Sequence, residues 1–476
     1  MGPPLVAAAA AALPFVTRST AAWVNVLTMP LSAIAAIAVA IRVTSGGSIP
    51  ELGVWRIDAL SALLAVLIAL VATLAAWLGP GLDRDDQEAM AITRAYRIYS
   101  NLFALTMLVA VTTNNLGLMW VAIEATTVTS ALLVPVRRSK AAVEASWKYL
   151  IIGSVGIALA FAGTVLAFVD YASTGGNVNA ALNWTTLRAA APALHPEVAR
   201  LAFAFLLVGF GTKAGLAPMH TWLPDAHSEA PAPLSSMMSG VLLAVALYAL
   251  ARWKAVVDVT LGSAFADTML LVVAMTTILI GSLSIVAQRQ YKRLLAYSSI
   301  EHMGLACFGL ALGPLGVFAG LLHLTGHALA KSTAFLLSGR VMDRYQSHEI
   351  AKAAGLLRAL PGTGLLFAAG ILALMGLPPF SLFLSEILLV RAGWNAGHPL
   401  LAGVVLICLL IAFVSLIDHL QRMLFGEPPV GIVRGERSIT ALVVLSTPLF
   451  VLIWIGVALP PPMLTLLTKA TEVLRP

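Results

Sequence analysis

Two ionisable residues lie inside segments that are otherwise strongly apolar. Lys213 follows the run from Leu201 to Val208, and Glu124 lies in the segment 118–127, Leu-Met-Trp-Val-Ala-Ile-Glu-Ala-Thr-Thr. A charged side chain at the centre of a membrane helix costs about 2.5–3.5 kcal/mol on insertion scales. Such groups are rarely retained for packing alone, so the chemistry that these residue types favour is the storage and release of a proton.

Glu124 and Lys213 carry opposite charges and could act as a switch. Burial disfavours the charged form of either side chain, and an opposite charge nearby restores it. A pair that forms and breaks would therefore make the lysine hold its proton and then release it. The alternative interpretation is that Glu124 is a hydrogen-bonded core carboxylate that fixes helix packing.

His323, His327 and Lys331 follow one another at steps of four residues. On a helix they share one face over about 12 Å, and histidine titrates near neutral pH. We interpret this stripe as a relay, although His323 alone would more often be a packed histidine. Two histidines at this spacing could also ligate a metal, but we find neither a third ligand nor an HExxH pattern and predict no metal site.

Further titratable groups lie in two polar stretches. Glu386 comes soon after Pro378-Pro379, and His227 belongs to the polar stretch that begins near Lys213. Glu386 has the same alternative as Glu124, a packed core carboxylate. Glu301-His302 favours two interpretations equally, a proton entrance or a cap that supports helix packing.

Composition places these residues in a membrane protein. The chain is 59% hydrophobic and 11% charged, with a mean hydropathy of +0.92, which indicates an all-α polytopic membrane protein. The net charge of +7 is a topology signal rather than a nucleic-acid footprint. Cys307 and Cys408 form no CxxC, disulfide or cluster pattern, and no GxGxxG or haem pattern is present. We therefore predict no cofactor of the chain's own.

A hydropathy window predicts about fourteen transmembrane helices, of which the first is short. The predicted spans are 5–16, 22–43, 57–78, 97–113, 115–135, 148–169, 199–218, 232–254, 267–287, 294–313, 315–340, 363–390, 400–424 and 439–461. Loops on one side hold eighteen Lys and Arg residues and loops on the other hold nine, with Lys213 and Lys331 inside the membrane. This excess predicts that both termini lie on the outer side.

A short motif recurs in the two halves of the chain. Gly215-Leu-Ala-Pro218 is echoed by Gly376-Leu-Pro-Pro379, and we expect Pro218, Pro378 and Pro379 to break helices seven and twelve. Five spans separate the two copies, so the repeats would be inverted, and paired broken helices point to a transport path. We divide the chain into helices 1–3 (1–96), a first bundle (97–254), a second bundle (255–425), and helix 14 with a tail (426–476).

These motifs resemble the antiporter-like proton-translocating subunits of respiratory complex I, Mrp antiporters and membrane-bound hydrogenases. The likeness runs from about residue 57 to 425. The stretch from Lys213 to Pro233 is highly specific to that family, and the segments around Glu124, Glu301 and Lys331 are most similar to the F subunit of hydrogenase-4.

The resemblance implies fourteen helices with helices 4–8 and 9–13 as inverted bundles. It implies that Glu124 and Lys213 are the charge-switch pair, that the His323 to Lys331 stripe is the central relay, and that Glu386 is the outlet. It also implies a prokaryotic inner membrane, and partners that comprise other membrane subunits, a peripheral redox arm, protons or Na⁺ or K⁺, and lipid. The function implied is proton translocation in an oxidoreductase complex, hydrogenase-4-like. The alternatives are a cation/proton antiporter subunit, a complex I subunit, or a substrate-importing assembly built on this fold.

The chain departs from the family pattern in two places. Many relatives carry Lys or His midway along helix eight, whereas segment 241–248 here has neither. The link from Lys213 to His327 would then need water, or Ser236 and Ser239. The long lateral helix of the distal complex I subunit is also absent from the sequence, which argues against that member of the family.

Overall fold

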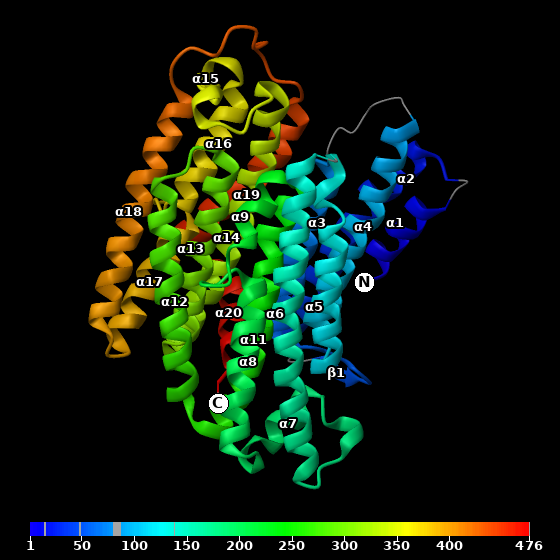
Figure 1. The fold of residues 1–476 in the computed structure, drawn as a ribbon, viewed down its shortest axis with the longest axis vertical. Coiled ribbons are helices and arrows are strands. Elements are labelled where there is room, and N and C mark those ends of the chain that lie inside the picture. Colours follow the sequence, from blue (N-terminus) through cyan, green and yellow to red (C-terminus); the bar gives the residue numbers. More distant parts are fainter. Residues whose placement is uncertain (14–15, 47–48, 80–86, 138, 476) are drawn as a thin grey trace.

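The computed structural model describes residues 1–13, 16–46, 49–79, 87–137 and 139–475. Long helices run along one common direction and form the whole body of the molecule (Figure 1). In chain order they are α1 (Gly2–Ala12), α2 (Arg18–Gly46), α3 (Ala59–Trp77), α4 (Gln87–Thr112), α5 (Leu116–Ala131), α6 (Lys140–Ser173), α7 (Trp184–Ala190), α8 (Pro196–Ala214), α9 (Trp222–Glu229), α10 (Ala232–Met237), α11 (Leu243–Leu261), α12 (Ser263–Val286), α13 (Tyr291–Leu310), α14 (Gly313–Tyr345), α15 (Leu356–Ala359), α16 (Pro361–Leu374), α17 (Ser381–Asn395), α18 (Pro399–Leu424), α19 (Ile439–Val457) and α20 (Pro461–Val473).

Each predicted span coincides with a helix or with two consecutive helices. Within the described ranges, nine helices are long and apolar enough to cross a membrane, and ten if the bent pair Ile350–Ala359 and Pro361–Leu374 counts as one span. The helices α8, α13 and α14 are long enough but do not meet this criterion, because they carry charged residues and histidines, among them those of the candidate site and Glu197 and Arg200 of α8. The number fourteen stays a prediction.

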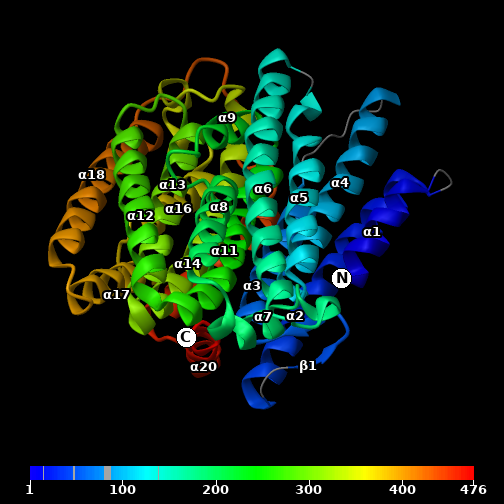
Figure 2. The same ribbon diagram turned by 60° about the horizontal axis from the view of Figure 1, so that its bottom comes forward.

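The buried centre of the bundle is made by α14 and by α10 and α11 with the π-helical segment η4 (Met238–Leu242) between them. The most apolar stretch of 232–261 is entirely buried. Gly240 brings η4 close to α14, since a Cβ there would meet the Ala328 carbonyl oxygen at 3.1 Å. Helix α18 lies at one edge of the bundle (Figure 2). Both α18 and α2 expose apolar side chains, such as Leu410 and Ile34, as helices that face lipid do.

Both predicted helix breaks are present, and the residue that ends each helix is a glycine rather than a proline. Gly215 (φ 74°) and Gly376 (φ 65°) take the left-handed conformation. Leu216 N–H donates to the Gly211 carbonyl at 2.8 Å, and Leu377 N–H donates to the Leu372 carbonyl at 3.2 Å. This is the Schellman pattern of helix ends. The prolines lie beyond it, in the linkers to α9 and α17.

The first helix is short, as the sequence predicts: α1 has eleven residues and is about 16 Å long, half of a bilayer core. Two other features differ from the sequence interpretation. Strands β1 (Ile49–Leu52) and β2 (Trp55–Ile57) form a small antiparallel hairpin. The tail after α19 forms a further helix, α20, which begins at Pro461. Its Lys469 donates to the Val43 and Thr44 carbonyls at the end of α2.

Candidate functional site

Glu124 and Lys213 come together, and a third side chain joins them. The Thr127 hydroxyl donates to Glu124 Oε2 at 3.0 Å and accepts from Lys213 Nζ at 2.8 Å. The other carboxylate oxygen of Glu124 accepts from Ser154 Oγ at 2.7 Å. Helices α5, α6 and α8 thus meet at one carboxylate, and the lysine reaches it through a hydroxyl.

Lys213 is fully buried at the end of α8. Its Nζ also donates to the Tyr149 hydroxyl at 2.7 Å and lies 4.6 Å from the centre of the Tyr149 ring, a favourable cation–π position. Trp222 stacks on Tyr149 at 4.5 Å and donates its indole N–H to the Thr212 carbonyl at 2.9 Å. The break between α8 and α9 therefore holds the lysine against an aromatic wall, where the helix C-terminus favours a cation.

His302 and His323 form a hydrogen-bonded pair between α13 and α14. His302 Nδ1 lies 3.0 Å from His323 Nε2, and the His302 ring centre lies 5.3 Å from that of His327. On its other side, His323 Nδ1 lies 3.0 Å from Ser385 Oγ. Ser385 donates its own proton to the Leu382 carbonyl at 2.8 Å, and a carbonyl can only accept.

This bond to a carbonyl sets the position of each proton in the chain. Because the Ser385 proton goes to Leu382, Ser385 Oγ accepts from His323 and the proton of His323 is on Nδ1. His323 Nε2 then carries a lone pair, and His302 Nδ1–H donates to it. When both imidazoles are neutral, the hydrogen bonds can point only from His302 to His323 to Ser385. The passage of a proton would reverse the direction of these hydrogen bonds.

Glu386 of α17 lies near the hydrogen-bonded pair of His302 and His323. The side chain is 8% exposed, and Oε1 has no hydrogen-bond partner among the described residues. Its carboxylate occupies the space where a Cβ of residue 376 would lie, so Gly376 is required there twice, for its φ and for its missing side chain. Glu386 borders a recess of about 430 Å³ between α17 and α18, lined otherwise by apolar residues such as Phe383 and Leu409.

His227 and His327 are fully buried imidazoles whose ring nitrogens have no hydrogen-bond partner among the residues that the structure describes. His227 stacks on Phe335 of α14 at 4.9 Å, and the charge of Lys331 acts on both histidines. Buried polar groups in proteins are paired with protein or with ordered water. The ring nitrogens of both histidines are therefore available for hydrogen bonds with water, which can carry a proton.

Lys331 is fully buried, and its Nζ donates to the Leu295 carbonyl of α13 at 2.7 Å. The same carbonyl accepts from Ser299 Oγ at 2.9 Å, and Ser299 pairs with Ser239 of η4 at 2.7 Å. Ser236 instead donates to the Pro233 carbonyl of its own helix at 2.7 Å. Ser236 and Ser239 are the two serines expected to link Lys213 to His327 in the predicted span 232–254. Of these two, only Ser239 is hydrogen-bonded to Ser299 and thereby connected to Lys331.

The predicted residues therefore fall into two groups. Glu124 and Lys213 form the first. The second contains His227, His323, His327, Lys331 and Glu386, joined by Glu301 and His302, which the sequence left undecided. Glu301 is buried, accepts from Ser282 at 2.9 Å and interacts electrostatically with Lys331. Within the described residues no hydrogen bond joins Lys213 to a residue of the second group, since its Nζ bonds Thr127 and Tyr149.

Sequence reasoning missed three side chains. Thr127 lies three residues after Glu124, and this spacing places both on one helix face, so a signal for it existed. Tyr149 and Ser385 reach the site from other helices, α6 and α17, and a single sequence offers no pattern that would indicate their contacts with Lys213 and His323.

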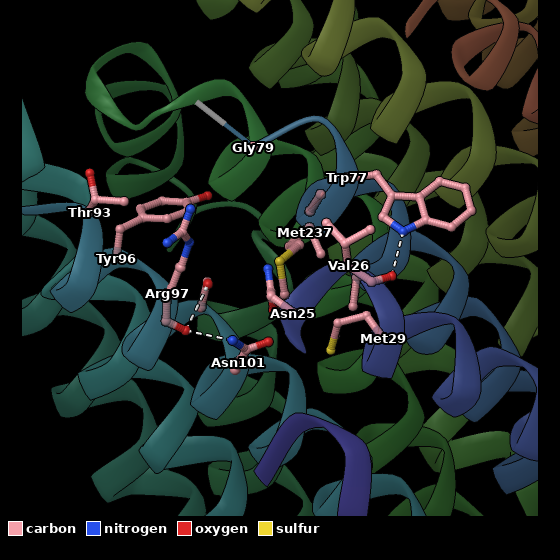
Figure 3. A pocket seen from close by; sticks show the side chains of 14 residues that line it. Asn25, Val26, Met29, Trp77, Gly79, Thr93, Tyr96, Arg97, Asn101 and Met237 are labelled. Carbon is pink, nitrogen blue, oxygen red and sulfur yellow. Dashed lines mark hydrogen bonds between the residues drawn. The ribbon is translucent and has the colours of Figure 1, made fainter. Parts of the chain in front are cut away.

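A separate polar cavity lies among α2, α3 and α4 (Figure 3). It has a volume of about 230 Å³, and its lining includes Asn25, Tyr96, Arg97 and Asn101. At its edge the Trp77 indole donates to the Val26 carbonyl at 2.9 Å. None of the candidate proton-path residues lines this cavity.

The chain is similar to known membrane proteins along most of its length. Residues 113–412 match the transmembrane family described as NADH:quinone oxidoreductase/Mrp antiporter. The chain is 41% identical over 373 residues to a hydrogenase-4 component F homolog of Methylacidiphilum infernorum, which covers 77% of each chain. It is 31% identical over 425 residues to an NAD(P)H-quinone oxidoreductase chain 4 of Picosynechococcus, covering 84% of this chain and 75% of that one.

Solved structures share the fold along the entire chain. An archaeal membrane-bound sulfane sulfur reductase contains a chain that superposes with a TM-score of 0.88 at 27% identity, covering 99% of this chain and 96% of that one. A chain of respiratory complex I from Thermus thermophilus superposes with a TM-score of 0.79 at 25% identity, covering 96% of each. A chain of the Mrp complex from Dietzia gives 0.84 at 22% identity, covering 99% and 96%, a likeness of fold alone.

Proposed function

Because the chain belongs to the NADH:quinone oxidoreductase/Mrp antiporter family of membrane subunits, we propose that it translocates protons as one subunit of a hydrogenase-4-like oxidoreductase complex. The observation that carries this proposal is the Glu124–Thr127–Lys213 chain of hydrogen bonds. A buried lysine that reaches its counter-charge only through a hydroxyl can lose that stabilisation by one rotation of a side chain.

The proposed cycle starts with a protonated Lys213. While Thr127 bridges it to Glu124, the ammonium is stabilised by the carboxylate and by Tyr149. When the bridge breaks, a buried ammonium without a counter-charge is unfavourable, and the lysine releases its proton. The ring nitrogens of His227, which have no hydrogen-bond partner among the described residues, would receive it.

The second group then carries the proton onward. Lys331 and His327 follow His227, and the His302–His323 pair passes the proton toward Glu386 by reversing its hydrogen-bond direction. Glu386 serves as the outlet beside the recess between α17 and α18. His302 and Glu301 join the five residues of this group that the sequence pointed to.

Redox chemistry belongs to partner subunits in this proposal. The energy of their reaction would be delivered as a movement or charge that breaks the bridge at Thr127. We further propose a prokaryotic plasma membrane with both termini outside. The C-terminal end lies at the end of the bundle that carries β1 and α7, opposite α15 and the α18–α19 loop (Figure 1), and that loop contains Arg434 and Arg437.

The four segments and the inverted repeats remain part of the proposal. Both α8 and α16 end in Gly-Leu with Schellman bonds, which agrees with a repeat, although many unrelated helices end in the same way. The segment 97–254 would then contribute Glu124, Lys213 and His227, and the segment 255–425 the other titratable residues of the second group.

The test is proton uptake by vesicles that contain the reconstituted complex, followed with a pH-sensitive dye during turnover of the redox partner. We expect a gradient that Lys213→Ala abolishes. A gradient that forms equally in that variant contradicts the proposal. Proton movement driven by an imposed Na⁺ or K⁺ gradient, without redox turnover, would instead establish the antiporter alternative, which the description of the matching family also includes.

A further inference from the structure

Three potential metal ligands meet where α13, α14 and α17 cross. His302, His323 and Glu386 each offer one ligand atom, and these atoms lie within 4.8 Å of one another. All three side chains are buried. The sequence offered only the pair His323 and His327 with no third ligand, whereas the fold replaces His327 by two residues of other helices.

The distances suit a tetrahedral ion. Ligands about 2.0–2.2 Å from zinc lie about 3.4 Å apart, and His302 Nδ1 lies 3.0 Å from His323 Nε2. The ligand atom of Glu386 lies within 4.8 Å of those of the two histidines, so rotation of its side chain toward them would bring it to the ligand spacing. Its Oε1 has no hydrogen bond to a described residue that this movement would break.

The surroundings also prepare His323 to bind a metal. Its Nδ1–H is held by Ser385, so Nε2 carries the lone pair and faces the centre of the cluster. Metal-ligating histidines commonly have their second nitrogen fixed in this way, which orients the ring and selects the tautomer. His302 needs only to shift its proton from Nδ1 to Nε2.

We propose that His302, His323 and Glu386 bind one divalent transition-metal ion of the zinc class, and that the bound ion stops proton transfer. Two imidazoles and one carboxylate suit Zn²⁺ or Co²⁺, whereas Mg²⁺ and Ca²⁺ require a shell of oxygens. The inhibitory part rests on the proposed function, because the ion occupies the lone pairs on which the proton would travel. The recess that Glu386 borders gives the site an opening.

Binding is tested on the purified full-length chain with Co²⁺ as the probe. We expect one ion per chain with the visible spectrum of tetrahedral cobalt, displaced by Zn²⁺. His323→Gln and Glu386→Gln should each weaken binding by at least about tenfold. The matched control is His419→Gln, since His419 is also buried but lies on α18 with its Nε2 3.3 Å from the Ile285 carbonyl.

Two results of this measurement would overturn the site. One is that the wild-type chain takes up no stoichiometric Co²⁺. The other is that His323→Gln and Glu386→Gln bind Co²⁺ as tightly as His419→Gln does. Either result leaves the proposed function untouched, because neither involves transport.

Inhibition is tested in vesicles that carry the reconstituted complex. Zn²⁺ should slow proton uptake in the wild type and in His419→Gln at the concentration that displaces Co²⁺, while the redox rate measured with an uncoupler persists. Stoichiometric binding with undiminished proton uptake would refute the inhibitory role alone. A wild-type complex that binds Co²⁺ but moves no protons would refute the proposed function and leave the metal site standing.

Discussion

The Thr127 hydroxyl accepts a hydrogen bond from Lys213 Nζ at 2.8 Å and donates one to Glu124 Oε2 at 3.0 Å. The orientation of this hydroxyl therefore determines how strongly the Glu124 carboxylate stabilises the Lys213 ammonium. A direct ion pair would have to be pulled apart by moving helices. A bridge through a hydroxyl opens by rotation about one side-chain bond, which is a smaller movement and can be coupled to a small change in a neighbouring subunit.

Thr127→Val tests the bridge, because valine keeps the shape and removes the hydroxyl. A hydrogen bond to a charged group contributes about 1.5–3 kcal/mol, so we expect proton uptake to fall by about tenfold or more while the complex assembles. The matched control is Thr126→Val, whose hydroxyl bonds only the Ile123 carbonyl of its own helix at 2.6 Å. Equal uptake by the two variants would exclude a role for the bridge.

Lys213→Ala should abolish proton uptake without preventing assembly, and Glu124→Gln should resemble it, because a neutral amide cannot stabilise the ammonium. Uptake and the amount of assembled complex are both measured. Lys148→Ala is the control, since Lys148 is half exposed and pairs with Glu144 at 2.7 Å on the surface. If Glu124 only supports packing, Glu124→Gln will pump normally and Glu124→Ala will fail to assemble.

The histidine chain should act as one unit. We expect the losses in His323→Gln and Glu386→Gln to be non-additive in the double variant, because one broken station already interrupts the path. Ser385→Ala should shift the pH profile of uptake by freeing the His323 tautomer, whereas Ser381→Ala should not, since Ser381 Oγ has no partner among the described residues. Strictly additive losses in uptake rate would show that the residues work independently.

The sequence predicted the family, which is confirmed, and the helices that carry the titratable groups. Apolar runs and helix-breaking residues are local signals, and a charge inside such a run is conspicuous. Packing partners are not local. Tyr149 meets Lys213 across 64 positions of the chain and Ser385 meets His323 across 62, and no spacing rule in one sequence links such residues. Glu301 and His302 stayed undecided for the same reason.

Glu436 gives the stability a pH dependence outside the membrane. It lies in the α18–α19 loop and accepts from the Thr363 backbone N–H at 2.7 Å, the Thr363 hydroxyl at 2.8 Å and Arg340 at 3.0 Å. Burial alone would raise the pKa of this carboxyl, but these donors hold the pKa below its ordinary value of 4.5. The stabilisation is therefore present above pH 4.5 and is lost as the pH falls through the lowered pKa.

Glu436→Gln should accordingly lower the Tm at neutral pH. We expect the free energy of unfolding to fall by about 1–3 kcal/mol. The difference in Tm from the wild type should shrink as the pH is lowered below 4.5. Glu349→Gln removes an exposed pair with Lys352 and should change Tm much less. A difference that stays constant between neutral pH and about pH 3 would mean that Glu436 acts through packing rather than through its charge.

Segment 241–248, which belongs to η4 and α11, contains no lysine or histidine, and this gives a prediction about Ser239. Ser239 is hydrogen-bonded to Ser299, whose hydroxyl shares the Leu295 carbonyl with Lys331. We therefore expect Ser239→Ala to slow proton uptake and Ser236→Ala, which loses only a bond within its own helix, to leave it unchanged.

Ala244→Lys probes the same region from the other direction. Ala244 is fully buried in α11, so a lysine there would have to be desolvated at a cost of several kcal/mol and would fill the space that a water chain needs. We expect uptake or assembly to fall, measured by dye quenching and by the yield of complex. Full uptake in Ala244→Lys together with full uptake in Ser239→Ala would contradict a water-filled link between Lys213 and His327 that depends on Ser239.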